Sequence, residues 1–355
     1  MKNQNKKIAA KIISVGSFVP NENKPISNQD LINKGVQTDD AWIIERTGIR
    51  QRYIANDLNY IFDKQKFLNN NADFQPTLTS DLAVAAAKNA LQNANLNAND
   101  IDLIIVATST PDYVFPSTAC LVQQKLANNN ENATAFDVQA VCSGFVYALA
   151  TAEKFIASGS HKRALVIGAE IFSNILDWND RSTCVLFGDG AGAVILEAVD
   201  NETTQNKIIG SKLLADGSYN KILNVPGQIH QGTIFGDPVL KMDGQAVFKF
   251  AVKSLSSVAE QICQEHNLSV TENVDFLIPH QANERIIQAV GKRLKLSADK
   301  VISTVHLHAN TSAASVPLAL DFAVKNGHIK INSGQTILLE AIGGGFAWGA
   351  VLLKI

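Results

Sequence analysis

The sequence predicts an α/β fold built from two similar halves. Short apolar runs alternate with helical patterns along the 355-residue chain, as in proteins whose buried strands are covered by helices. The runs at 102–105 and 275–278 resemble each other, and so do the glycine-led runs at 192–196 and 349–353. These similarities predict an internal duplication. No long linker rich in Pro, Gly or Ser separates the halves, so we expect one rigid body.

The first fifty residues are predicted to begin with a strand and to end with a capped helix. Residues 8–18 alternate and are rich in β-branched side chains, which favours a strand. Residues 38–50 begin as a capped amphipathic helix that ends at Gly48, and this helix places Trp42 close to Arg46. A tryptophan beside an arginine can stack on a nucleotide and contact its phosphate, and it can equally anchor the helix to the core.

Residues 56–79 are predicted to leave the core. This stretch is rich in Asn and Asp and carries several aromatic residues, so we expect a long surface excursion with a partly ordered helix at most. The remaining elements of the first half are predicted from periodicity and turn residues. They are helices at 80–94 and 117–126, strands at 101–108 and 163–168, a polar loop at 128–132, a loop at 177–181 and a glycine-rich strand entry at 187–193.

The most informative stretch surrounds Cys142. An apolar run over 135–141 breaks at this cysteine and continues with helical spacing to Ala157, which predicts a strand, a tight turn and a buried helix. A cysteine at a helix start lies near free N–H groups and the positive end of the helix dipole, and both stabilise the thiolate. Cys142 is therefore a candidate nucleophile, although a buried cysteine is equally often a small core residue.

Two later residues could support a cysteine nucleophile. His280 follows the predicted strand at 275–278, and Asn310 precedes a helix of small residues. All three groups thus lie at strand-to-helix junctions, which form the ligand-binding edge of parallel α/β sheets. A single histidine there would more often be structural, and a single asparagine would more often cap a helix. Three such groups at equivalent edges predict a shared site.

Composition argues against several classes of protein. The net charge is −2, from 31 basic and 33 acidic residues, whereas nucleic-acid-binding proteins usually carry a basic surplus. No apolar stretch reaches the length of a membrane span, and the basic start is not followed by a secretory signal. The four cysteines lack metal-binding or disulfide spacing, and His306 with His308 falls short of the three or four ligands of a zinc site. We expect a cytoplasmic protein with no metal and no membrane or nucleic-acid partner.

Taken together, several motifs resemble β-ketoacyl-acyl-carrier-protein synthase III, the initiating condensing enzymes of type II fatty acid synthesis in the thiolase superfamily. The resemblance covers nearly the whole chain. It rests on the stretches 38–50, 115–117, 136–145, 187–193, 279–283, 310–315 and 343–346. It implies a thiolase-like five-layered fold (α-β-α-β-α) with duplicated halves at 1–200 and 201–355, a homodimer, and no cofactor beyond the substrates acyl-CoA and malonyl-acyl-carrier protein (malonyl-ACP).

The resemblance maps a Cys-His-Asn triad onto Cys142, His280 and Asn310. Cys142 would attack the thioester of an acyl-CoA, and the backbone N–H groups of Cys142 and Gly344 would form the oxyanion hole. Malonyl-ACP would then lose CO₂, and His280 and Asn310 would each donate a side-chain N–H to the enolate oxygen.

The resemblance also implies substrate contacts outside the triad. Trp42 and Arg181 would stack on the adenine of CoA, and Thr38, Arg46 and Asn283 would help to hold its phosphates or pantetheine arm. A basic surface for the acidic carrier protein would consist of Lys249, Arg285, Lys292 and Arg293, although isolated basic side chains usually just cover surfaces. The acyl pocket would be lined by Phe172 and, from the partner subunit, by Phe115.

Three departures from the family pattern leave the substrate open. The 56–79 excursion is longer than in many relatives, Ser182 stands where glycine is frequent, and Phe172 is bulkier than the usual aliphatic residue. The leading prediction is an acetyl-primed condensation. The alternatives are a related acyltransferase that uses another starter in secondary metabolism, and a non-catalytic acyl-CoA-binding relative. The last would lack a nucleophile, whereas Cys142 is present.

Overall fold

The computed structural model describes residues 7–127 and 133–355. The basic start at 1–6 and the polar loop predicted at 128–132 lie outside the described residues. Among the helices of the described part, none is long and apolar enough to cross a bilayer.

The first sheet belongs to the first half of the chain and has the strand order β1-β7-β6-β4-β5. Its strands are β1 (Ile8–Phe18), β4 (Leu103–Ala107), β5 (Thr134–Val138), β6 (Arg163–Glu170) and β7 (Gly190–Asp200). The strands β4, β5 and β6 run parallel, whereas β7 is antiparallel to both of its neighbours. The strand predicted at 8–18 is confirmed as β1, and the one predicted at 163–168 extends two residues further, to Glu170.

The second sheet repeats this arrangement. Its strands are β8 (Lys207–Ala215), β13 (Phe276–Pro279), β14 (Thr336–Gly343) and β15 (Ala347–Lys354), in the order β13-β14-β15-β8. β13 and β14 are parallel, and the pairs β14/β15 and β15/β8 are antiparallel, as in the corresponding pairs of the first sheet. The stretches that resemble each other in sequence occupy corresponding strands: β4 with β13, and β7 with β15. The boundary at 200/201 stays a prediction.

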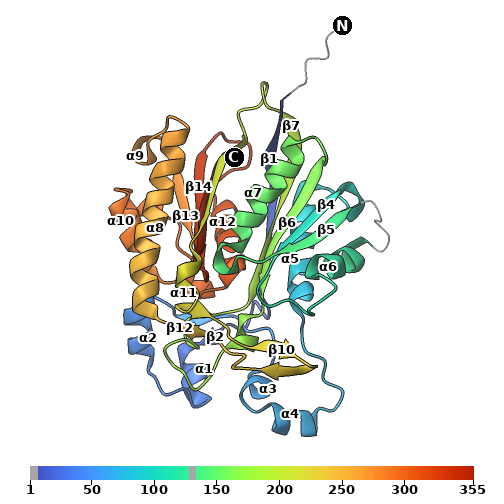
Figure 1. Cartoon of the computed structure of the whole chain (residues 1–355), viewed down its shortest axis with the longest axis vertical. Coiled ribbons are helices and arrows are strands. Elements are labelled where there is room, and N and C mark those ends of the chain that lie inside the picture. Colours follow the sequence, from blue (N-terminus) through green and yellow to red (C-terminus); the bar gives the residue numbers. More distant parts are fainter. Residues whose placement is uncertain (1–6, 128–132) are drawn as a thin grey trace.

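Helices and sheets form five layers in the order α-β-α-β-α (Figure 1). The outer face of the first sheet is covered by α5 (Thr79–Ala94) and α6 (Thr118–Ala127), and that of the second by α8 (Gly244–Glu265) and α10 (Glu284–Arg293). The middle layer contains α7 (Gly144–Ala157) and α12 (Ser315–Lys325). The five-layered fold predicted from the resemblance is confirmed.

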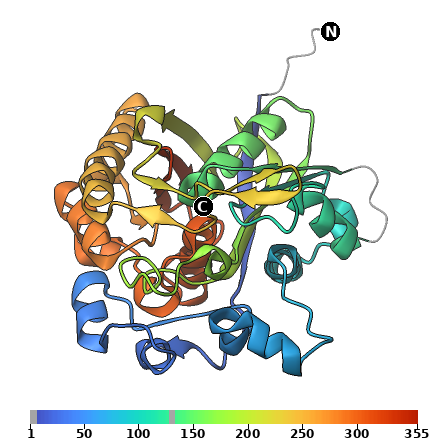
Figure 2. The same ribbon diagram turned by 60° about the horizontal axis from the view of Figure 1, so that its bottom comes forward.

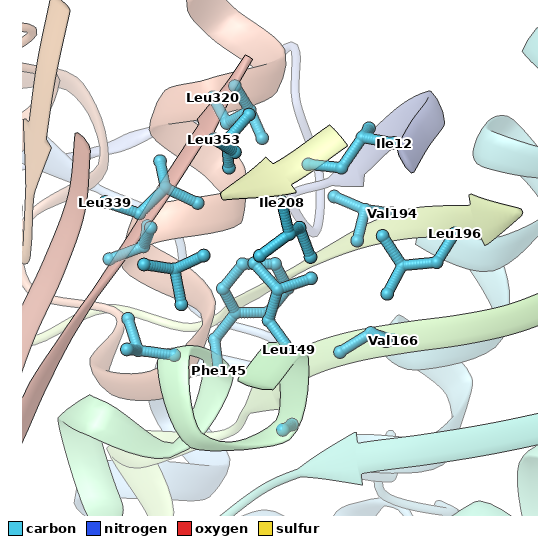
Figure 3. Packing of buried hydrophobic residues seen from close by; sticks show 14 of the residues in the cluster. Ile12, Phe145, Leu149, Val166, Val194, Leu196, Ile208, Leu320, Leu339 and Leu353 are labelled. Carbon is cyan, nitrogen blue, oxygen red and sulfur yellow. The ribbon is translucent and has the colours of Figure 1, made fainter. Parts of the chain in front are cut away.

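The middle layer holds the two sheets together. Figure 3 shows Phe145 and Leu149 of α7 packed among side chains of both sheets, including Val166 of β6 and Leu339 of β14. These four side chains are completely buried. Each such burial stabilises the fold by about 1.5–3 kcal/mol, so the two halves are joined by a continuous apolar core.

Two glycines let the first sheet approach the second half closely. A Cβ at Gly168 of β6 would overlap the carbonyl of Ala313, and one at Gly192 of β7 would lie 2.7 Å from Pro317 Cβ. Because only glycine leaves this space, the turn before α12 is held directly against the first sheet.

Most of the remaining elements lie at one end of the layers, at the bottom of Figure 1 and in front in Figure 2, whereas α9 lies at the opposite end. The helices are α1 (Asn28–Asn33), α2 (Asp40–Thr47), α3 (Leu58–Phe62), α4 (Lys64–Asn70), α9 (Val270–Asn273) and α11 (Val305–His308). The short strands are β2 (Ile26–Ser27), β3 (Gln51–Arg52), β9 (Leu223–Asn224), β10 (Gln228–His230), β11 (Thr233–Phe235) and β12 (Lys241–Met242). The 3₁₀ turns are η1 (Ala98–Asp100), η2 (Val141–Ser143), η3 (Phe172–Ile175), η4 (Gly217–Tyr219), η5 (Ala298–Lys300) and η6 (Ser312–Ala314).

The predicted excursion at 56–79 forms the two short helices α3 and α4 and then an extended return to α5. Tyr60, Phe67 and Phe74 pack together, with ring centroids 4.8–5.8 Å apart. Three of the four aromatic residues of this segment therefore form a small local cluster, and the fourth, Phe62, packs on Trp178 instead.

Candidate active site

A cavity of about 760 Å³ opens where the two halves meet. Its lining includes Cys142 from the first half and His280 and Asn310 from the second. The exposed fractions of these residues are only 4%, 3% and 6%. The structure therefore brings the three predicted groups together in the wall of one cavity.

Cys142 is presented by the 3₁₀ turn η2, between strand β5 and helix α7. The preceding residue, Val141, has φ 49°, a left-handed conformation that is uncommon for a β-branched side chain. Such strain persists only where the surrounding structure holds it, and it is concentrated at functional sites. The first N–H groups of α7 point back toward this turn, so the position predicted for Cys142 at a helix start is confirmed.

The expectation of a stabilised thiolate is wrong for the substrate-free site. Burial raises the pKa of the Cys142 thiol to about 12, and the nearby Glu170 carboxyl acts in the same direction. A hydrogen bond with the Ser312 side chain opposes them. A helix terminus contributes about 0.3–1 kcal/mol, whereas complete desolvation can shift a pKa by several units. Cys142 therefore rests as the protonated thiol.

His280 is a neutral side chain with a fixed orientation. Its Nδ1 lies 2.6 Å from the Ser315 hydroxyl oxygen, which also accepts a hydrogen bond from the Gln281 N–H at 3.3 Å. If the Ser315 hydroxyl donates to Nδ1, the ring proton resides on Nε2. Burial lowers the pKa of His280 to about 3, so the imidazole stays neutral near pH 7. A neutral Nε2–H can stabilise a developing oxyanion without giving up its proton.

Asn310 is held in place through both its backbone and its side chain. Its N–H donates to the Leu186 carbonyl at 2.9 Å, and its carbonyl accepts from the Gly188 N–H at 3.0 Å. The side-chain Oδ1 accepts from the Ser312 N–H at 2.8 Å. Because the oxygen end is engaged in this way, Nδ2 is the end left to donate to a substrate.

The glycine turn after β14 lies against η2. A Cβ at Gly343 would lie 2.6 Å from the Ala140 carbonyl oxygen and 2.7 Å from the Cys142 amide nitrogen. A Cβ at Gly344, the residue predicted for the oxyanion hole, would lie 2.7 Å from the Leu223 carbonyl oxygen. Any larger residue would push the two turns apart, so glycine keeps this backbone beside the candidate nucleophile.

Comparison with known proteins identifies the family of this chain. Two family models match the chain: 3-oxoacyl-[acyl-carrier-protein (ACP)] synthase III over residues 136–217, and its C-terminal counterpart over 263–355. The β-ketoacyl-[acyl-carrier-protein] synthase III of Neisseria gonorrhoeae strain NCCP11945 is 56% identical over 345 residues, which cover 97% of this chain and 99% of the relative. The chain belongs to the β-ketoacyl-acyl-carrier-protein synthase III family.

Solved structures agree with this assignment. The 3-oxoacyl-[acyl-carrier-protein] synthase III of Aquifex aeolicus VF5 has a TM-score of 0.84 and 41% identity, covering 98% of this chain and all of that one. The enzyme of Pseudomonas aeruginosa PAO1 has a TM-score of 0.83 and 35% identity, covering 98% of both chains. Synthase III enzymes are acyl-transferring condensing enzymes that initiate fatty acid synthesis. This chain is an enzyme of that kind, which argues against the non-catalytic alternative.

Three of the five residues predicted to bind CoA in the synthase III family line the cavity, and a fourth contacts one of them. Trp42 of α2 has the guanidinium carbons of Arg46 and Arg181 at 4.6 Å and 4.9 Å from its ring centroid. Asn283 caps α10 and donates from Nδ2 to the Arg46 carbonyl at 3.0 Å. Trp42, Arg46 and Asn283 line the cavity, whereas Arg181 and Thr38 lie outside its lining.

The four residues predicted for carrier-protein docking in the synthase III family separate into two pairs. Lys249 on α8 and Arg285 on α10 are exposed and line the cavity. Lys292 and Arg293, at the far end of α10, are exposed and lie outside the lining. The structure therefore places the first pair, and not the second, beside the entrance to the site.

The two phenylalanines predicted for the synthase III acyl pocket differ strongly in environment. Phe172 is buried in the cavity wall and stacks on Phe187, with ring centroids 4.4 Å apart. Phe115 is 83% exposed and lies outside the lining of this chain's own cavity. Its neighbours Tyr113 and Val114 are also exposed, so this loop presents an apolar tip to its surroundings.

Sequence reasoning missed three polar residues that lie close to Cys142, His280 or Asn310. Ser312 and Ser315 lie in the 310–315 motif but were assigned no role, and Glu170 follows the predicted strand at 163–168. A glutamate two residues after the apolar run at 164–168 was the available signal, because buried carboxylates at strand ends are rarely incidental.

No group of three or more His, Cys, Asp or Glu side chains suited to a metal ion occurs within residues 7–127 and 133–355. His306 and His308 lie on the short helix α11, and burial lowers the pKa of both. No metal is needed to account for the chemistry derived below.

Proposed function

We propose that this chain transfers an acyl group, in the first instance acetyl, from acyl-CoA to Cys142 and condenses it with malonyl-ACP. One observation carries the proposal: the buried thiol of Cys142 lines the same cavity as His280 and Asn310, whose neutral side chains can donate N–H hydrogen bonds. The lining of this cavity also includes the basic residues Arg46, Lys249 and Arg285. Acylation needs a nucleophile, and decarboxylation needs donors to an enolate oxygen; this cavity contains both.

Acylation would begin when Cys142 Sγ attacks the carbonyl carbon of the acyl-CoA thioester. Negative charge then develops on the carbonyl oxygen, and the N–H groups of Cys142 and Gly344 are the proposed donors to it. The close approach of the Gly343–Gly344 turn to η2 supports this role. Loss of one such donor typically costs about 2.7–4 kcal/mol of transition-state stabilisation. The adduct collapses by releasing the CoA sulfur, which leaves acyl-Cys142.

Condensation would use the two side-chain donors. As the malonyl carboxylate leaves as CO₂, its electron pair forms an enolate whose oxygen accepts from His280 Nε2–H and Asn310 Nδ2–H. The enolate carbon then attacks the acyl-Cys142 carbonyl and breaks the bond to Sγ, giving β-ketoacyl-ACP and free Cys142. The pKa of His280, lowered to about 3 by burial, supports a hydrogen-bond donor rather than a proton donor.

CoA and the carrier protein would use the same entrance in turn. Trp42, Arg46, Arg181, Thr38 and Asn283 are proposed to hold CoA, since aromatic and guanidinium planes stack on adenine and cations pair with phosphates. Lys249 and Arg285 are proposed to meet the acidic carrier protein. The positions of Lys292 and Arg293 favour a peripheral contribution at most.

We further propose a homodimer, because burying an exposed apolar side chain such as Phe115 against a partner subunit is energetically favourable. Phe115 would then complete the acyl pocket of the partner subunit opposite Phe172. The protein would work in the cytoplasm, where acyl-CoA is present and a reducing environment keeps Cys142 as a free thiol.

Intact-mass analysis after mixing the protein with acyl-CoAs of increasing length tests the proposal. Wild type should gain one acyl group with acetyl-CoA and lose it when malonyl-ACP is added. Cys142→Ala should gain none. Cys263→Ala is the matched control, since this buried cysteine lies on α8 outside the cavity, and it should behave as wild type.

Other outcomes would change the proposal in defined ways. An adduct with longer or branched acyl groups but not with acetyl would replace the starter assignment by the alternative of another acyl-CoA. Absence of any adduct on Cys142 with every acyl-CoA tested would refute the proposed function.

A further inference from the structure

The carboxyl group of Glu170 lies behind the nucleophile and has no part in the chemistry above. Glu170 ends β6 and is completely buried. Its Oε2 accepts from the hydroxyls of Thr110 at 2.5 Å and Thr108 at 3.2 Å, and both oxygens lie 3.1 Å from the Ser109 amide nitrogen. Its Oε1 also accepts from the Ser312 hydroxyl at 3.1 Å. The carboxylate is thus fully engaged by donors and faces no cation among these partners.

Ser312 connects this carboxyl group with the nucleophile. Its hydroxyl donates to Glu170, and its turn η6 packs against η2, so that the Ser312 side chain lies close enough to Cys142 to lower the pKa of the thiol. Its backbone N–H orients Asn310. Ser312 has φ 50°, a left-handed conformation that a serine does not adopt without support, so its position between the two groups is imposed by the fold.

We propose that Cys142, Ser312 and Glu170 form a proton relay that activates the nucleophile, an inference that rests on the proposed acyl-transfer function. As Cys142 Sγ bonds to the acyl carbon, the thiol proton passes to the Ser312 oxygen. The original Ser312 hydroxyl proton passes to the Glu170 carboxylate.

The relay balances over one catalytic cycle. During acylation the Sγ–H bond breaks, the Sγ–C bond forms, and Glu170 becomes a carboxylic acid. The CoA sulfur leaves with the electron pair of its C–S bond and takes a proton from water. During condensation the Sγ–C bond breaks, Cys142 becomes a thiolate, and the proton of Glu170 returns to it through Ser312. The initial thiol and carboxylate are restored.

Electrostatics favour such an exchange over independent ionisation. Before and after the proton transfer, Cys142, Ser312 and Glu170 together carry one negative charge. Ionising Cys142 beside an ionised Glu170 would instead bury two negative charges. Burial raises the pKa of Glu170 to about 7, and the ionised carboxyl raises the pKa of Cys142. The groups that face Glu170 are the thiol from η2, the hydroxyls of Thr108 and Thr110 after β4, and the hydroxyl of Ser312 from η6.

A purely structural role would explain the same hydrogen bonds, since Glu170 also ties the end of β4 to η6. The two roles differ in what Glu170→Gln does. The amide oxygen can still accept hydrogen bonds at this position, but the amide cannot take up a proton near neutral pH. Loss of the relay therefore changes thiol reactivity and its pH dependence, whereas a lost structural contact lowers stability.

The test measures alkylation of Cys142 by iodoacetamide against pH, followed by peptide mass analysis. The exposed Cys120 is an internal reference in every sample. Glu170→Gln and Ser312→Ala should each slow alkylation of Cys142 relative to Cys120 by about 100-fold. Both should also remove a rise in the rate around the pKa of about 7. Glu170→Asp, which keeps an acid at this position, should recover part of the rate.

The matched control is Glu340→Gln. Glu340 is a second completely buried carboxyl, on β14, whose side-chain oxygens have no hydrogen-bond partner in the described part of the chain. Glu340→Gln should keep the wild-type ratio of Cys142 to Cys120 alkylation rates and the wild-type dependence of this ratio on pH. A Cys142 to Cys120 ratio in Glu170→Gln within twofold of wild type at every pH would overturn the relay. If Glu170→Gln does not fold, the same threshold applies to Ser312→Ala.

The two proposals can fail separately. The alkylation profile needs no acyl-CoA, so it reports on the relay whatever the starter is. If the profile depends on Glu170 and Ser312 but no acyl-CoA acylates wild type, the relay stands and the proposed function falls. If acetyl-CoA acylates wild type and Glu170→Gln at equal rates, the proposed function stands and the relay falls.

Discussion

The turns η2 and η6 have the same backbone design in the two halves but carry different chemistry. Each is a three-residue 3₁₀ turn whose first residue is left-handed, Val141 with φ 49° and Ser312 with φ 50°. Each leads directly into a buried helix of the middle layer, α7 or α12. The middle residue of η2 is Cys142, and that of η6 is Ala313.

This difference suggests how a duplicated fold divides its labour. The first turn provides the proposed nucleophile and otherwise small or apolar side chains. The second provides polar side chains that surround the nucleophile: Asn310 before the turn, Ser312 within it, and Ser315 behind His280. The two turns have the same backbone conformation, and the proposed site depends on the difference between their side chains.

The largest effect is expected when the cysteine is moved from η2 to η6. The double variant Cys142→Ala, Ala313→Cys keeps one cysteine in an equivalent backbone position. We expect condensation to fall by about 10⁴-fold or more, because the donors of His280 and Asn310 are arranged around η2. Product formation from acetyl-CoA and malonyl-ACP measures it. Activity within tenfold of wild type would mean that the two turns are interchangeable.

Removing the donors separates the proposed duties of the two halves. His280→Ala and Asn310→Ala should reduce condensation by about 10²–10³-fold while Cys142 still becomes acylated, because the enolate loses a donor and the nucleophile does not. Intact-mass analysis before and after addition of malonyl-ACP separates the two steps. An equal loss in both steps would contradict the division of labour.

Glycine substitutions test each turn through its packing. Gly343→Ala should displace η2 and mainly slow acylation, and Gly168→Ala should displace η6 and mainly slow condensation, since each Cβ would overlap backbone atoms of its turn. Overpacking of this kind costs about 1–3 kcal/mol of stability. Thermal unfolding and the two partial reactions provide the readouts. The same kinetic defect in both variants would show that the turns move together.

The last prediction concerns the stability of the fold and the buried carboxyl of the second half. Burial raises the pKa of Glu340 from 4.5 to about 8, so its protonated form stabilises the fold below pH 4.5 and this contribution is lost as the pH rises through about 8. Glu340→Gln removes that dependence. We expect a gain on the order of 4 kcal/mol at alkaline pH and little change in acid. Urea unfolding at several pH values measures it, and a pH-independent difference would contradict this account.

The sequence predicted the α/β layers and the site well wherever local pattern was sufficient. Strand β1, the helix that ends at Gly48 and the junction at Cys142 follow from alternation, capping and periodicity, which act over a few residues. The resemblance placed His280 and Asn310 in one cavity with Cys142, as the structure has them.

The errors concern properties that arise only when distant segments meet. The raised pKa of Cys142 depends on its enclosure and on Glu170, which approaches from another strand. The orientation of His280 depends on Ser315, 35 residues away. Neither pattern nor spacing reports burial of this kind, so the helix dipole was given too much weight and the buried carboxyl none.

The protonated resting state of Cys142 also bears on oxidative damage. Peroxide attacks thiolates far faster than thiols, and a cysteine residue that is only 4% exposed is shielded as well. An enzyme that generates its thiolate only during acyl transfer can therefore wait for substrate without being oxidised to a sulfenic acid. Peptide mass analysis after mild peroxide treatment should find the exposed Cys120 oxidised before Cys142. The burial that raises the pKa of the nucleophile is thus also its protection against oxidation.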